Sequence, residues 1–266
     1  MSAEKLLKLI SDEDAEYVDI RFTDPRGKLQ HVTVMSDQVD ADFIEEGFMF
    51  DGSSIAGWKS IEASDMKLMM DTESGYVDPF YAEKTICVHC YVVEPDTGEA
   101  YNRDPRGTAM KAEAYLKSSG IGDTFFVGPE AEFFLFDDVR FSNSMNKVAF
   151  EVDALDASWN TDTEYEIGNT GHRPGVKGGY FPVNPTDDGQ DIRSEMLSTM
   201  KRLGMSVDKH HHEVASCQHE LGLIFSSLTK QGDELQKFKY VIHNVAQAYG
   251  KSATFMPKPI AGDNGT

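Results

Sequence analysis

The sequence predicts an α+β fold, with a small hairpin-rich region first and then antiparallel strands with helices packed on them. Near the start, Val18, Ile20 and Phe22 alternate with polar residues, which is the period of a strand with one solvated face. Much later, Ile192 and Met196 begin an apolar series at helical spacing. Strand-like apolar segments fill the region between them, without an internal repeat.

Local signals define the elements of the first region. Leu6 and Ile10 mark a short N-terminal helix. The turn residues 24–27 separate two strand patterns, so residues 16–34 are predicted to form a hairpin. A longer apolar run, residues 85–93, predicts a further strand.

A helix with clear boundary signals comes next. Asp104 is a favourable N-cap, Pro105 is a favourable first residue, and Gly120 fits as the stop. We place the domain boundary here, which divides the chain into residues 1–104 and 105–266.

The second region combines strands and helices around one long loop. Residues 168–189 are rich in glycine and proline and too long for a simple connector, so we expect a functional or disordered loop. Helices are expected at residues 192–203 and 235–249, each followed by a glycine. Strands are expected at residues 124–127, 130–137, 147–152, 205–214 and 218–225.

The excess of acidic residues limits the classes of partner that the chain can bind. Of the 266 residues, 45 are acidic and 25 are basic, which gives a formal net charge of −20. This charge argues against binding to nucleic acid or to an anionic membrane surface. The start lacks the apolar core of a signal peptide, and no apolar run approaches transmembrane length. We therefore expect a cytoplasmic protein.

Two groups of soft metal ligands are better explained without zinc. Cys87 and Cys90 match C-x-x-C, but they lie in the apolar run, where their thiols face opposite sides. We interpret them as small buried residues. In the tract His210–His212, the middle imidazole faces away from its neighbours on a strand, and neither an H-E-x-x-H motif nor a cysteine partner accompanies it.

Four carboxylates predict a site for a hard metal ion. Glu130 and Glu132 stand two residues apart in a segment that resembles a buried strand, so both should point to the same face. Glu213 and Glu220 lie in a second strand-like region. Like charges on a half-buried strand repel, and a divalent cation is the simplest compensation. From spacing alone, a solvated or ion-paired strand face explains them equally well.

Several blocks of the sequence follow the order of one enzyme family. They are Met49–Ile55 with Glu62–Asp65, Asn102–Arg106, Gly128–Phe133, Gly171–Pro174 with Lys177–Pro182, His211–Val214 with Gln218–Glu220, and Ala253–Pro259 with Gly262–Gly265. Through these blocks the chain resembles bacterial type I glutamine synthetase, from about residue 5 to the last residue.

The resemblance implies a β-grasp-like N-terminal domain and a catalytic domain built on an antiparallel sheet. It also implies a homo-oligomer of two stacked hexameric rings, with active sites between subunits. The implied partners are ATP, glutamate and ammonium. The glutamate side chain attacks the γ-phosphate of ATP, and ammonia then opens the γ-glutamyl phosphate to give glutamine. Two Mg²⁺ or Mn²⁺ ions per site would neutralise the charge that this reaction concentrates.

The family pattern also assigns residues to the metal ions and to ammonium. The metal ligands are Glu132, Glu213 and Glu220 for one ion and Glu130 for the other. Asp51 and Ser54 would reach into a neighbouring subunit's site, where Asp51 would help to bind ammonium and take its proton. Tyr180 would line the same pocket with Glu213.

Four further residues would bind glutamate and the nucleotide. Asn264 and Gly265 would hold the amino-acid end of glutamate, and Phe225 would pack on adenine. Asp208 falls where the family usually has a glutamate near the nucleotide, so the resemblance leaves its side-chain role open.

The chain stops at Thr266, inside the glutamate-binding motif and before a histidine metal ligand and the phosphate-binding arginines of the family. We therefore expect these residues alone to be inactive and to be part of a complete enzyme. Two alternatives stay open. One is a related γ-glutamyl ligase that uses an amine or polyamine, and the other is a truncated, non-catalytic paralogue with a binding or regulatory role.

Overall fold

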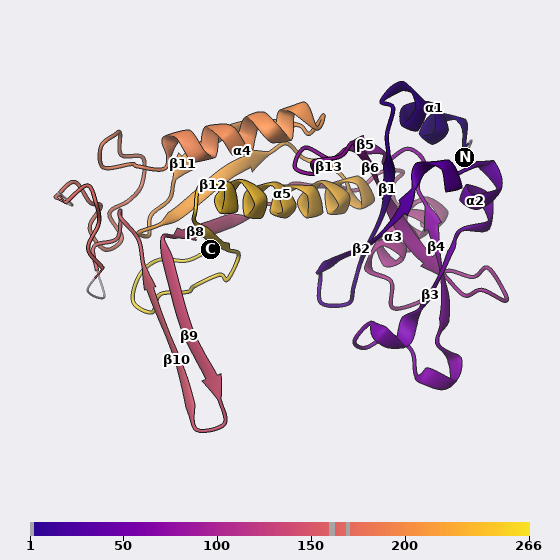
Figure 1. Ribbon diagram of the computed structural model, residues 1–266, viewed down its shortest axis with the longest axis horizontal. Coiled ribbons are helices and arrows are strands. Elements are labelled where there is room, and N and C mark those ends of the chain that lie inside the picture. Colours follow the sequence, from indigo (N-terminus) through magenta and orange to yellow (C-terminus); the bar gives the residue numbers. More distant parts are fainter. Residues whose placement is uncertain (1–2, 160–162, 169–170) are drawn as a thin grey trace. The chain divides into compact units, whose positions relative to one another are not determined.

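The computed structural model describes residues 3–159, 163–168 and 171–266, and the chain forms two compact units (Figure 1). The first unit comprises Met1–Val127 and Ser226–Gln236, and the second comprises Gly128–Phe225 and Lys237–Thr266. Both contain helices and sheets whose strands are mostly antiparallel, which confirms the predicted α+β class. Within the described ranges, no helix has both the length and the apolarity needed to cross a membrane.

A mixed sheet forms the core of the first unit. β1 (Tyr17–Thr23) pairs antiparallel with β2 (Leu29–Met35), which confirms the predicted hairpin, and parallel with β6 (Thr85–Val93). Val18, Ile20 and Phe22 of β1 and most apolar residues of β6 are buried, as their patterns predict. The other face of β1 was predicted to be solvated, but Asp19 and Arg21 are buried there as well. The apolar residues of β2 are half-buried, except Met35, which is exposed. The remaining strands are β3 (Phe48–Asp51) and β4 (Asp65–Met70), in the order β2-β1-β6-β4-β3, and β5 (Tyr76–Val77), which pairs with β6.

The helices of the first unit follow their sequence signals. α1 (Glu4–Asp12) confirms the predicted N-terminal helix. α3 (Pro105–Ser119) begins and ends as predicted, because Asp104 accepts hydrogen bonds from two backbone N–H groups and Gly120 adopts φ 72°. Cys87 and Cys90 are buried and free, as interpreted. The unit also contains α2 (Ala41–Glu46) and short 3₁₀ helices at Ser36–Gln38, Gly52–Ser54 and Ile61–Ala63.

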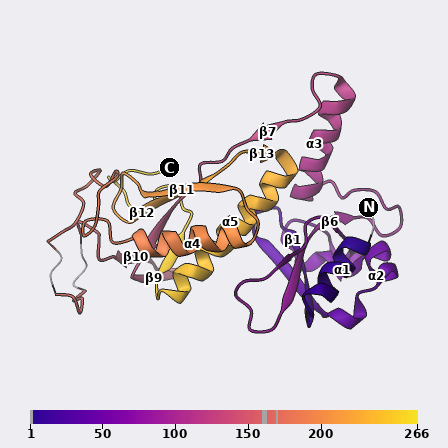
Figure 2. The ribbon, with the colours of Figure 1, turned by 90° about the horizontal axis from the view of Figure 1, so that it is seen from above.

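An antiparallel sheet forms the core of the second unit. Its strands, in spatial order, are β11 (Val207–His212), β12 (Gln218–Leu223), β8 (Glu132–Phe136) and β14 (Ser252–Thr254). α4 (Gln190–Arg202) lies alongside β11 and β12 (Figure 2). Ile192 and Met196 are buried on α4, which confirms the helical series read from the sequence.

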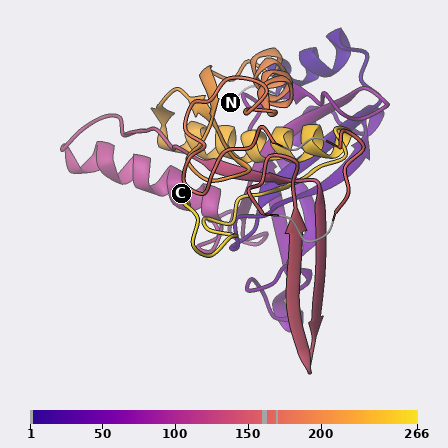
Figure 3. The same ribbon diagram turned by 90° about the vertical axis from the view of Figure 1, so that its left-hand side faces the viewer.

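A second pair of strands, β9 (Asp138–Ser144) and β10 (Lys147–Asp153), forms a hairpin that extends away from this sheet (Figure 3). β9 was not among the predicted strands, because most of its residues are polar or exposed. α5 (Leu228–Ala248) begins before its predicted start at residue 235 and supplies residues to both units. β7 (Phe126–Val127) pairs with β13 (Ser226–Ser227) in the first unit. Within the predicted loop 168–189, residues 169–170 lie outside the described residues.

Candidate metal centre

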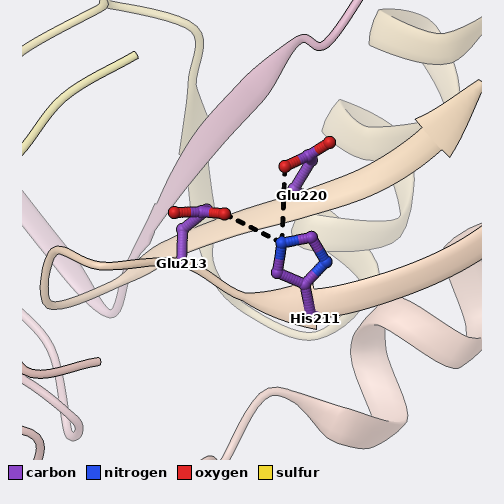
Figure 4. A group of neighbouring side chains, drawn as sticks. All are labelled: His211, Glu213 and Glu220. Carbon is purple, nitrogen blue, oxygen red and sulfur yellow. Dashed lines mark hydrogen bonds and ion pairs between the residues drawn. The ribbon is translucent and has the colours of Figure 1, made fainter. Parts of the chain in front are cut away.

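His211, Glu213 and Glu220 converge at the sheet of the second unit (Figure 4). His211 Nε2 lies 2.8 Å from a carboxylate oxygen of Glu213 and 3.4 Å from one of Glu220. One candidate ligand atom of each side chain lies within 4.8 Å of the others. All three side chains are largely withdrawn from solvent, with exposed fractions of 10–13%. They are close enough together to share one cation.

The register of three adjacent strands builds this centre. His211 of β11 stands opposite Glu220 of β12, and Glu220 stands opposite Glu132 of β8. Residues that stand opposite each other in neighbouring strands share a face, so a row of polar side chains crosses the sheet. Glu213 follows two residues after His211, and it therefore returns to the same side.

The environment of these carboxylates disfavours their negative charge. Burial raises the pKa of Glu132, and the charges of Glu213 and Glu220 raise it further. Burial also raises the pKa of Glu220, with further increases from Glu213 and Glu130 and an opposing effect of His211. A divalent cation would relieve this repulsion, and the carboxylate oxygens of Glu132, Glu213 and Glu220 suit Mg²⁺ or Mn²⁺. The residues present therefore fit the metal that the sequence predicts.

Glu130 departs from the prediction. β8 begins at Glu132, so Glu130 precedes the strand and is exposed, instead of lying with Glu132 on one buried strand. Glu130 follows Pro129, which has no backbone N–H to donate to a sheet. The charge of Glu130 still raises the pKa of Glu220, so Glu130 lies at the edge of the same centre.

The turn between β11 and β12 holds Glu213 in place. Glu213 donates its backbone N–H to the Gln218 carbonyl oxygen at 2.8 Å. Side-chain oxygens accept the other four N–H groups: Val214 donates to Glu213 (2.9 Å), Ala215 to Gln218 (3.0 Å), Ser216 to Asp263 (3.2 Å) and Cys217 to Asp156 (3.0 Å). These bonds hold Cys217 at a φ of 65°, which is costly for a residue other than glycine. Gln218 also donates to Glu132, so it supports a second carboxylate of the row.

The three consecutive histidines serve two faces, as strand alternation predicts. His211 points to the carboxylates, whereas His212 bonds Asp156 at 2.8 Å and donates to the Glu213 carbonyl oxygen at 2.6 Å. Burial would lower the pKa of His212, but the hydrogen bond and charge of Asp156, the bond to the Glu213 backbone and the charge of Asp187 together outweigh burial and raise this pKa. The sequence analysis did not single out His211 as a ligand for a hard metal ion, although its spacing from Glu213 carried that signal.

The glycine-rich loop brings Tyr180 beside this centre. The rings of Tyr180 and Phe181 stack with centroids 3.9 Å apart, and both meet His211 edge-on, at 5.8 and 4.8 Å. Gly179 donates to the Val214 carbonyl oxygen at 3.0 Å. A Cβ at position 179 would lie 2.6 Å from the backbone oxygen of Glu213, so only glycine allows this approach.

The segment Asp263–Thr266 is anchored to the turn that holds Glu213. Asp263 accepts a hydrogen bond from the Ser216 backbone N–H, and Thr266 donates its backbone N–H to the Pro257 carbonyl oxygen at 3.0 Å. Asn264 and Gly265 lie between these two contacts. A Cβ at position 265 would lie 2.4 Å from the Pro257 carbonyl oxygen, so this segment packs closely on its neighbour.

The remaining predicted residues are not members of this cluster. Asp208 is exposed on β11 and packs against Gly222, and Phe225 is 63% exposed just after β12. Asp51 and Ser54 belong to the first unit, where Asp51 ends β3 and accepts hydrogen bonds from the Ser53 backbone N–H and hydroxyl. These bonds to Ser53 lower the pKa of Asp51.

Comparison with protein families covers nearly the whole chain. Residues 102–266 match the family model "Glutamine synthetase, catalytic domain", and residues 14–95 match "Glutamine synthetase, beta-Grasp domain". The second match agrees with the β-grasp-like domain that the resemblance implied.

Curated relatives named glutamine synthetase match the full length of this chain. The protein of Cereibacter sphaeroides is 73% identical over 98% of this chain, and that of Rhodobacter capsulatus is 71% identical over 100%. The chain spans 56% and 61% of these two relatives, so it covers little more than half of their length.

A solved structure titled as a glutamine synthetase of Plasmodium falciparum has the same fold. It superimposes with a TM-score of 0.93 at 28% identity and matches 100% of this chain, which covers 52% of that chain. A more distant structure, titled as a GmaS/ADP complex, shares the fold at 24% identity with a TM-score of 0.74, over 98% of this chain and 53% of that one.

Proposed function

Because this chain belongs to the glutamine synthetase family, we propose that the protein ligates ammonia to L-glutamate with cleavage of ATP, by way of γ-glutamyl phosphate. The observation that carries the proposal is the row of polar side chains across β11, β12 and β8, where partly buried carboxylates repel one another. Phosphoryl transfer between a carboxylate and a triphosphate needs cations at such a place.

We assign the metal ligands by combining the family pattern with this geometry. Glu132, Glu213 and Glu220 hold one Mg²⁺ or Mn²⁺ ion, and Glu130 serves a second ion at the edge of the centre. When bound, the ions neutralise charge on the phosphates and on the reacting carboxylate. Gln218 and Asp156 hold the turn and the strand ends, so the carboxylates keep their positions.

The ammonium pocket is assigned to residues of both units. Tyr180 and Glu213 lie together beside His211, which supports a shared role in binding ammonium. Asp51 accepts the ammonium proton and Ser54 supports it, in the site of a neighbouring subunit of a homo-oligomer. The lowered pKa of Asp51, caused by its bonds with Ser53, keeps its carboxylate ionised, which favours attraction of the ammonium cation.

The substrates are assigned to two edges of the centre. Asn264 and Gly265 bind the amino-acid end of glutamate, which their place next to Asp263, the residue that bonds the turn of Glu213, supports. Asp208 and Phe225 bind ATP, and their exposure leaves them accessible to it. The boundary near residue 104 divides the β-grasp domain from the catalytic domain. We also propose that the protein assembles as two stacked hexameric rings. We expect a cytoplasmic location and no nucleic-acid or membrane partner.

Glutamine formation from glutamate, ammonium and ATP tests this function directly. We expect turnover that requires Mg²⁺ or Mn²⁺ and that prefers ammonium over putrescine in competition. Glu132→Gln should reduce turnover and weaken metal binding while the assembly stays intact. Preferential use of putrescine, or unaltered metal dependence in the variant, would contradict the proposal.

A further inference from the structure

Asp263 joins three segments of the second unit through one buried carboxylate. The residue is only 3% exposed. One carboxylate oxygen accepts hydrogen bonds from the backbone N–H groups of Lys177 at 3.0 Å and Asn264 at 2.9 Å, and the other accepts from Ser216 at 3.2 Å. These donors belong to the glycine-rich loop, to the segment that contains Gly265, and to the turn that holds the metal ligand Glu213.

Two of the joined segments contain a residue in the left-handed region of the backbone map. Lys177 has φ 56°, and Cys217, which follows Ser216, has φ 65°. Such conformations cost about 1–3 kcal/mol each for ordinary residues and persist only where the surroundings enforce them. The carboxylate of Asp263 supplies part of that enforcement on both segments.

This set of three backbone donors requires a carboxylate at position 263. An ionised aspartate offers acceptors on both oxygens, whereas asparagine of the same shape offers one oxygen and one NH₂ group. In Asp263→Asn the NH₂ group would face at least one backbone N–H donor, and that segment would lose its anchor. Burial makes the unpaired donor costly.

We propose that Asp263 is a positioning residue for glutamate, a role that rests on the proposed function. Asn264 and Gly265 are fixed on one side by Asp263 and on the other by the hydrogen bond of the Thr266 backbone N–H to the Pro257 carbonyl oxygen. Asp263 thereby sets the distance between the segment that binds the amino-acid end and the turn that carries Glu213. It acts through the backbone of Asn264 and Ser216, because its carboxylate oxygens accept their N–H groups.

The test compares Asp263→Asn with a matched control, Asp104→Asn. Asp104 is likewise buried and accepts three backbone N–H bonds, from Val92, Arg106 and Gly107, but it belongs to the first unit. Binding of L-glutamate, Mn²⁺ and ADP is measured by calorimetry on the purified protein. Backbone hydrogen exchange is followed in peptides that cover residues 177, 216 and 264.

We expect Asp263→Asn to weaken glutamate binding by at least about tenfold, the usual effect of losing a supporting partner, while Mn²⁺ and ADP affinities change by less than about threefold. Exchange should quicken in the three joined segments and stay unchanged in β8 and β12. Asp104→Asn should leave all three affinities unchanged. If Asp263→Asn does not fold, Asp263→Glu, which keeps both oxygens on a longer side chain, should show a smaller glutamate-selective loss.

Two results would overturn the proposal, and a third separates it from the proposed function. Equal loss of all three ligands would mean a general structural role, and unchanged glutamate binding in the folded variants would mean no role in positioning. If the wild-type protein binds Mn²⁺ and ADP but not glutamate, the proposed function fails as well. If the wild-type protein binds glutamate and Asp263→Asn binds it equally, only the role of Asp263 fails.

Discussion

Two groups of carboxylates, one in each unit, differ in how their charge is balanced: the buried Arg21 balances the group around Asp19 in the first unit, whereas the group of Glu132 and Glu220 in the second unit keeps carboxylates whose pKa values are raised. In the first unit, Arg21 bonds Asp19, Asp78 and the hydroxyl of Tyr76, each at 2.7 Å. Burial alone would raise the pKa of Asp19, but hydrogen bonds from Thr33, His31 and Arg21 outweigh it and lower the pKa.

At the candidate metal centre of the second unit the shifts have the opposite direction, whereas elsewhere in that unit bonds from Arg193 help to outweigh burial and lower the pKa of Asp187. The pKa values of Glu132 and Glu220 are raised, first by burial and then by neighbouring carboxylates. Buried carboxylates therefore serve two purposes. A group that the protein neutralises internally stabilises the fold, whereas a group that it leaves repelling is suited to an external cation.

The largest expected effect comes from removing the internal cation. Arg21→Met should destabilise the first unit by about 3–5 kcal/mol, because Asp19 and Asp78 would stay buried without their partner. Denaturant unfolding, with Arg202→Met as an exposed control, measures this loss. If the loss is below about 1 kcal/mol, the network does not stabilise the fold as argued.

The second-largest effect should come from removing one carboxylate charge from the candidate metal centre, where the carboxylates repel one another. Glu220→Gln should weaken Mn²⁺ binding by about a hundredfold, or about 2.8 kcal/mol, while the free energy of unfolding without metal stays equal or rises as repulsion decreases. Calorimetric titration with Mn²⁺ checks the first part, and unfolding in a chelator checks the second. Glu195→Gln, an exposed residue of the same unit, is the control. A variant that binds Mn²⁺ as the wild type does would remove Glu220 from the ligands.

Local sequence signals predicted elements whose boundaries depend on neighbouring residues in the chain. Asp104, Pro105 and Gly120 fixed α3 because capping is local. β9 escaped prediction although Val139 and Phe141 alternate with polar residues, because this pattern is short and both apolar side chains are exposed in the hairpin instead of covering a core. The start of α5 was placed too late because its first turns bury polar residues such as Gln231 and Glu234, which a hydrophobic pattern does not register.

The candidate site was likewise predictable from the sequence only in part. Glu132, Glu213 and Glu220 were visible as carboxylates on strand-like segments, but the register that sets His211 opposite Glu220 is a long-range property of the sheet. Sequence alternation placed Glu130 with Glu132 on one strand, which the start of β8 contradicts. Where a side chain carries no periodic signal, only the folded chain reveals its partners.

Mild acidity should weaken metal binding at the candidate centre and leave the group around Asp19 unaffected. The raised folded pKa values of Glu132 and Glu220 mean that protons compete with the metal at a higher pH than for an ordinary glutamate. Metal affinity is highest above these pKa values, where the carboxylates are ionised, and it decreases as the pH falls through them. We expect Mn²⁺ binding to weaken by about two- to tenfold between about pH 7 and about pH 5.5. The lowered pKa of Asp19 should keep the first unit stable over the same range. Affinity that stays constant or rises on acidification would contradict the carboxylate assignment.

The smallest effect concerns a charge pair that is neither buried nor part of the centre. Lys8 and Asp12 form an i,i+4 pair on α1, with side chains 69% and 58% exposed. Water already solvates both groups, and the order of Lys before Asp is the weaker orientation on a helix, so Lys8→Ala should change the free energy of unfolding by less than about 0.5 kcal/mol. Denaturant unfolding at low and high salt measures this. A loss comparable to that of Arg21→Met would mean that burial does not distinguish structural charge networks from surface pairs, and the contrast between the two units would then need another cause.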